Sequence, residues 1–64
     1  MDEKSIGAKL KELRAERSLA EVADKVGITA SALSNYEQGL RIPRDSIKRK
    51  LADYFNVGIE DLFF

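Results

Sequence analysis

The side chains best suited to specific contacts with another molecule gather in one short stretch of this chain. Very small or polar residues occupy one face of a predicted helix, namely Ala30, Ser31, Ala32, Ser34, Asn35 and Gln38. The amide of Asn35 can pair with both N6 and N7 of adenine, whereas Ser31 is ambiguous between bases and Ala30 can only contact a thymine methyl group. This face suits the floor of a DNA major groove. Without its context, Asn35 would be interpreted as an exposed polar residue on a surface helix.

Two short helices that cross at a steep angle are predicted to position this face. Ala23 is small where the two backbones would approach most closely, and Gly27 stands where the chain must leave the first helix with a positive φ. The inner faces and the corner between the helices are expected to consist of Val22, Ala23, Val26, Ile28, Leu33 and Tyr36. The pattern predicts a helix-turn-helix over about residues 19–38.

This motif and its flanks resemble the phage-repressor helix-turn-helix family, the Cro/cI-like or XRE-type group. The shared features, in chain order, are Leu13 and Arg14 in the first helix, Glu37 and Gly39 after the motif, Arg41 and Pro43 in a basic loop, and Asp61 and Leu62 in a terminal helix. The resemblance implies an all-α, compact five-helix, lambda-repressor-like domain over residues 1–64, with double-stranded DNA as its partner.

The resemblance also implies roles for individual residues. Base contacts would fall to Ala30, Ser31 and Asn35. Contacts with the DNA backbone would fall to Ala32, Gln38, Gly39, Leu40, Arg41 and Arg44. Arg14 and Glu37 would form a structural ion pair that pins the recognition helix to the first helix, and the hydroxyl of Ser34 is expected to bond back to a helical carbonyl.

The chain departs from the family at the first corner. Members usually have two more residues there, commonly a glycine and an apolar residue, whereas Arg17 is followed directly by Ser18. The first helix, expected over residues 4–17, therefore either ends a turn early, makes a tighter corner or partly fuses with the second. Leu19 replaces a glutamine that often reaches DNA in the family, so one phosphate contact is expected to be missing.

Capping signals mark the other helix ends. Ser18 and Glu21 have the spacing of a capping box, in which each side chain satisfies a backbone N–H. Expected N-caps of the first four helices are, in turn, Ser5 or Asp2, Ser18, Thr29 and Asp45. A fifth helix is predicted over residues 59–63, after Asn56 and Gly58 end the fourth.

Charge is balanced overall but not evenly distributed. The chain carries 11 basic and 11 acidic residues, for a formal net charge of zero. A basic cluster nevertheless follows the motif, formed by Arg41, Arg44, Lys48, Arg49 and Lys50. Phosphate binding depends on such residues, so the molecule is expected to have one positive side, the alternative being an ordinary solvated helix face.

Composition excludes several classes of protein. A chain of 64 residues is expected to form one domain. It has no cysteine and no histidine, which removes disulfides, zinc fingers and histidine-based catalysis. We therefore expect no enzyme, no metal or other cofactor and no small-molecule ligand. No apolar run is long enough to span a bilayer, so no membrane association and a cytoplasmic location are expected.

The predicted function is a transcriptional regulator, a repressor rather than an activator, that binds a roughly palindromic operator as a dimer. The alternative is an antitoxin or a small helical interaction module of the same fold, which salt-insensitive binding to a protein partner would support. Four large apolar residues crowd the C-terminus, namely Ile59, Leu62, Phe63 and Phe64. They are predicted to form a homodimer interface, the alternative being that Ile59 and Leu62 close the core.

Overall fold

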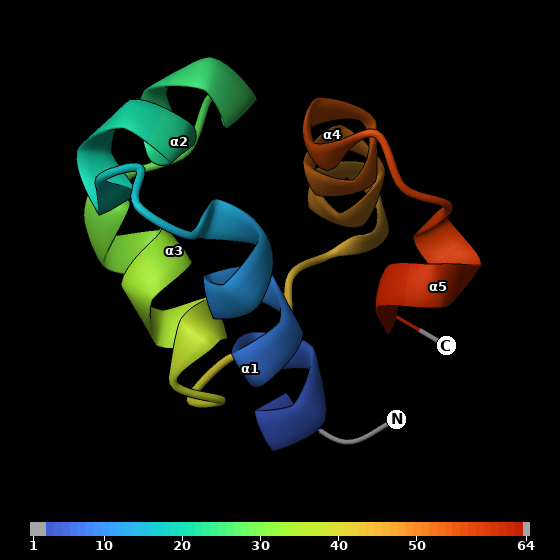
Figure 1. The fold of residues 1–64 in the computed structure, drawn as a ribbon. Coiled ribbons are helices and arrows are strands. Elements are labelled where there is room, and N and C mark those ends of the chain that lie inside the picture. The colour runs from blue at the N-terminus through green and yellow to red at the C-terminus, as the bar shows by residue number, and fades with distance from the viewer. Residues whose placement is uncertain (1–2, 64) are drawn as a thin grey trace.

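The computed structural model describes residues 3–63, which form helices and no strands (Figure 1). The helices are α1 (Glu3–Arg14), α2 (Leu19–Val26), α3 (Ala30–Glu37), α4 (Asp45–Phe55) and α5 (Ile59–Phe63). Helices α2 and α3 lie on one side of α1, and α4 and α5 lie on the other. Helix α1 contacts both α3 and α5, and α2 contacts both α3 and α4. The all-α, five-helix prediction is confirmed.

One core joins all five helices. Its buried apolar side chains are Ile6, Leu10, Val22, Ala23, Val26, Leu33, Tyr36, Leu51, Ala52, Leu62 and Phe63. The inner faces predicted for the two crossing helices are therefore confirmed, with Ile28 half-buried at the corner. Gly27 ends α2 with a φ of 85°, as predicted. Burial of this shared core fixes α3 against the rest of the chain.

Two of the C-terminal residues expected in a dimer interface are buried within their own chain. Leu62 is 0% exposed and Phe63 is 3% exposed, so both lie inside the core of their own chain. Leu13 and Phe55 are half-buried beside this core. Ile59 is also half-buried, and Phe64 lies outside the described residues. Helix α5 therefore closes the core through Leu62 and Phe63.

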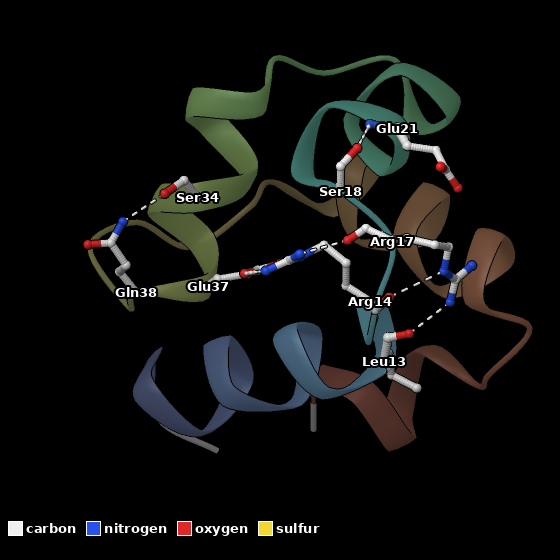
Figure 2. A network of polar contacts seen from close by, with 8 residues as sticks. All are labelled: Leu13, Arg14, Arg17, Ser18, Glu21, Ser34, Glu37 and Gln38. Atoms are coloured by element: carbon white, nitrogen blue, oxygen red, sulfur yellow. Dashed lines mark hydrogen bonds and ion pairs between the residues drawn. The ribbon is translucent and has the colours of Figure 1, made fainter.

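The expected caps of the two helices of the motif are present. The Ser18 hydroxyl accepts a bond of 3.0 Å from the N–H of Glu21, and the Thr29 hydroxyl accepts one of 3.0 Å from the N–H of Ala32. Only half of the capping box forms, since the Glu21 carboxylate points away from Ser18 (Figure 2).

The expected caps of α1 and α4 are not supported. Ser5 lies inside α1, and Asp2 lies outside the described residues. Arg44, not Asp45, occupies the N-cap of α4 and makes no side-chain capping bond. Asp45 is instead in the first turn, where a carboxylate is favourable beside the positive end of the helix dipole. Helix α4 therefore begins without a side-chain cap.

The first corner follows one of the three alternatives left open by the sequence: α1 ends early, at Arg14. Ala15 turns the chain in the left-handed region with a φ of 54°, and its N–H donates to the carbonyl of Lys11 at 3.1 Å. This is the single-bond form of a left-handed helix stop, a position where glycine is favoured because a Cβ is strained there.

The Arg17 side chain stabilises the first corner, which is two residues shorter than is usual in the family. Its Nη2 donates to the carbonyl of Leu13 at 2.8 Å and its Nε to the carbonyl of Arg14 at 3.3 Å, which satisfies the open end of α1 (Figure 2). Its Nη1 donates to the Tyr54 hydroxyl at 3.2 Å, and its guanidinium lies 5.3 Å from the Tyr54 ring centre and 5.4 Å from that of Phe55. The arginine thus ties the short corner to α4.

Replacing Ala15 by glycine is expected to stabilise the fold by about 1 kcal/mol, because it removes the Cβ from a left-handed position. Urea unfolding of both proteins measures the difference. Ala8→Gly is the matched control, since Ala8 is exposed inside α1 and glycine should cost about 1 kcal/mol there. Equal destabilisation by both variants would contradict the strained corner.

Candidate nucleic-acid interface

Helix α3 directs polar side chains away from the core, whereas Ala30 and Ala32, which were expected on the same outer face, are half-buried against the core. Leu33 and Tyr36 hold its inner face, while Ser31 is exposed and Asn35 is half-buried on the other side. The side-chain amide of Asn35 makes no hydrogen bond within residues 3–63, so both its donor and its acceptor are available to a ligand. Positions three or four apart share a helix face, so Ser31, Asn35 and Gln38 can contact one surface together.

A side-chain bond links two residues of this outer face. The Nε2 of Gln38 donates to the hydroxyl oxygen of Ser34 at 2.7 Å (Figure 2). This corrects the expected bond from Ser34 back to a helical carbonyl, which the structure does not show. The contact fixes the Gln38 side chain along the last turn of α3 and leaves one N–H and the amide oxygen of Gln38 available.

The end of α3 uses the backbone donors that were expected to bind phosphate. Gly39 adopts a φ of 75°, and the chain reverses in the double-bonded form of a left-handed helix stop. The N–H groups of residues 38–40 donate to helix carbonyls, Gln38 to Ser34 at 3.0 Å, Gly39 to Tyr36 at 3.2 Å and Leu40 to Asn35 at 2.9 Å. These three groups therefore already have acceptors within the chain, which favours side chains for phosphate contacts here.

Arg14 and Glu37 form a two-pronged ion pair between the ends of α1 and α3 (Figure 2). The Nε of Arg14 donates to Oε2 of Glu37 at 2.7 Å, and its Nη2 donates to Oε1 at 3.0 Å. The side chains are 16% and 6% exposed. The hydrogen bond to Glu37 raises the pKa of Arg14 above its usual value. The third nitrogen donates to the carbonyl of Arg17 at 2.7 Å, so the pair also ties α3 to the first corner.

Gly7 allows α1 to touch the same end of α3, which the sequence reasoning missed. A Cβ at this buried position would lie 2.7 Å from the carbonyl oxygen of Tyr36 and would collide with that of Glu37. The sequence feature that could have indicated this close packing is a glycine inside an otherwise helical apolar pattern. The last turn of α3 is thus held by both a close backbone approach and an ion pair.

The residues of the basic cluster differ in their surroundings. Arg41 and Arg44 are exposed in the segment that follows α3. Lys48 is half-buried, with its Nζ 5.6 Å from the ring centre of Phe63. Lys50 lines a shallow groove with Lys25 on α2. The arginines of the loop are therefore the cations nearest in sequence to the outer face of α3.

Two crossing helices, the second of which directs its polar face outward, are characteristic of DNA-binding helix-turn-helix proteins. The chain belongs to the helix-turn-helix family of XRE type, whose family model matches residues 10–62. This places it among DNA-binding transcriptional regulators. Comparison with curated proteins and with solved structures gave no match. Within the described part of the chain, no helix has both the length and the apolar character needed to cross a membrane.

Proposed function

We propose that this chain is a repressor that occupies a roughly palindromic operator as a symmetric dimer. The third helix of each copy would enter successive major grooves about one helical turn apart. The observation that carries the proposal is the unbonded amide of Asn35 on the outer face of α3, a helix held from behind by the Arg14–Glu37 pair. Occupancy of the operator is then sufficient to block transcription.

The contacts divide into those that read bases and those that hold the backbone. Ala30, Ser31 and Asn35 are proposed to face base edges. Ala32, the side chain of Gln38, Arg41 and Arg44 are proposed to face phosphates and sugars, because phosphate contacts set the register while base contacts set specificity. Gly39 contributes by allowing the sharp turn that carries the arginines past the end of α3.

Selection of bound duplexes from a random DNA library tests the proposal. A repressor of this type should enrich one sequence, with two halves related by a two-fold axis. Enrichment of no sequence would contradict specific binding, and enrichment of an asymmetric single site would contradict the dimer.

Asn35→Ala is expected to reduce the preference for the selected sequence over random DNA by about 1 to 3 kcal/mol, because a paired base contact is lost. Affinity for random DNA should hardly change, since no charge is removed. Competition binding measures the preference, and thermal unfolding checks that the fold is intact. Equal losses on both kinds of DNA would contradict base reading by Asn35.

Arg41→Ala is expected to weaken binding to all sequences alike and to reduce the salt dependence, the slope of log K against log salt, by about one unit. Each phosphate contact releases a counterion, so losing one contact lowers the slope. Lys9→Ala is the matched control, because it removes the same charge from an exposed position on α1. A slope that is unchanged in Arg41→Ala but reduced in Lys9→Ala would contradict the phosphate contact of Arg41 and indicate one for Lys9.

A further inference from the structure

Two large apolar side chains stand exposed on the loop that follows α3. Leu40 is 68% exposed and Ile42 is 48% exposed, and within the described part of the chain they are the large apolar residues that face solvent to this extent. They alternate with Arg41 in an irregular segment between α3 and α4. Isolated exposed leucines are ordinary, but this pair lies beside the surface proposed to contact DNA.

The loop is fixed at both ends, so the two side chains are held outward. The N–H of Leu40 donates to the carbonyl of Asn35 at 2.9 Å, which attaches the start of the loop to α3. Pro43 is fully buried and attaches its end to the core. A segment with these two anchors has little freedom to fold Leu40 and Ile42 inward, because moving them would break a helix stop or expose the proline.

We propose that Leu40 and Ile42 form the contact between two copies of this chain bound side by side on DNA. The inference rests on the proposed function, which requires two copies related by a two-fold axis, and it names the surface they share. A two-fold contact uses the same patch on both partners. The Leu62 and Phe63 side chains of the C-terminal helix are buried in their own chain, whereas Leu40 and Ile42 are exposed. The loop directly follows the helix that would enter the groove.

The same patch predicts that pairing depends on DNA. Two side chains on each copy cover only a small part of the roughly 1,000 Å² that a specific interface needs. Arg41 and Arg44, both exposed, flank the apolar pair and would bring like charges together in a dimer free in solution. Phosphates compensate those charges on the operator. The free chain is therefore a monomer, and the two copies bind cooperatively.

Binding to matched duplexes tests this inference. One duplex carries a single half-site recovered by the library selection, and others carry two inverted copies at centre-to-centre spacings near one helical turn. For the wild-type chain we expect the second copy to bind roughly 10- to 100-fold more tightly than the first, within the range usual for coupled sites. Sedimentation of the chain without DNA should show a monomer at micromolar concentration.

Ile42→Ser is expected to reduce the cooperative factor to about one and to leave half-site affinity unchanged, because Ile42 is not among the residues proposed to contact DNA. Ile42→Val keeps the patch apolar and should retain cooperativity. Cooperativity that survives the serine variant would overturn the inference, as would an equal loss of affinity on the single half-site, which would indicate direct contact of the loop with DNA. A stable dimer without DNA would also overturn it. Non-cooperative binding by the wild type would overturn the contact between copies but would be compatible with the proposed base contacts. The absence of any specific binding would overturn both the contact between copies and the proposed function.

Discussion

Replacing Gly7 by alanine is expected to destabilise the protein by about 3 kcal/mol, at the upper end of the range for inserting one methyl group into a packed site. The new Cβ would meet backbone atoms of Tyr36 and Glu37, which cannot move aside as a flexible side chain can. The helices must separate, and separation weakens the ion pair next to the contact. Urea unfolding measures the loss, and DNA binding should fall with it because α3 is displaced.

Gly58→Ala is the control for Gly7→Ala. A Cβ at Gly58 would lie 3.1 Å from the Oδ2 of Asp61, the mobile end of an exposed side chain, so the stability should change little. A Gly7→Ala protein as stable as the wild type would show that α1 and α3 are not in backbone contact.

Glu37→Gln is expected to cost about 3 kcal/mol, because the guanidinium of Arg14 would remain largely buried without its counter-charge. The affinity for the operator should also fall, since the end of α3 loses an anchor. Combining Arg14→Met with Glu37→Leu should recover much of the stability, because an apolar pair leaves no unpaired charge. Unfolding of the single and double variants in one thermodynamic cycle measures the coupling.

The pair of exposed Asp45 and half-buried Lys48 provides the comparison for this cycle. Its atoms are 3.8 Å apart and the Asp45 side chain is 92% exposed, so Asp45→Ala should change stability by less than about 0.5 kcal/mol at this surface site. If the double variant of Arg14 and Glu37 were as unstable as Glu37→Gln, the loss would come from packing volume and not from a stranded charge.

Local patterns were sufficient to predict the motif. The periodic spacing of Val22, Val26, Leu33 and Tyr36 identified the inner faces because a helix repeats every three to four residues. Ser18 and Thr29 were identified as caps by the same local reasoning. Such signals depend only on residues within one or two turns, and the structure confirms them.

Contacts between distant segments were not predictable from these patterns. The bond from Arg17 to Tyr54 spans 37 positions, and the approach of Gly7 to Tyr36 depends on how two helices cross. The burial of Leu62 and Phe63 likewise depends on how the helices pack together, which no local pattern specifies.

In the candidate site, too, some features follow from local sequence patterns and others depend on the three-dimensional structure. The exposure of Ser31 on α3 followed from the sequence pattern, whereas the packing of Ala30 and Ala32 against the core did not. The loss of the backbone donors of Gly39 and Leu40 did not, because it depends on the geometry with which the helix ends. The base contacts of Ala30, Ser31 and Asn35 stay predictions.

The arginine at the first corner has a consequence for how the molecule opens. Because Arg17 satisfies the last carbonyls of α1 while its guanidinium lies against two rings of α4, a fluctuation that releases α4 also uncovers the end of α1. Amide hydrogens at the end of α1 and in α4 would then exchange with solvent in the same opening event. We therefore expect the end of α1 and α4 to lose protection together, although they are far apart along the chain.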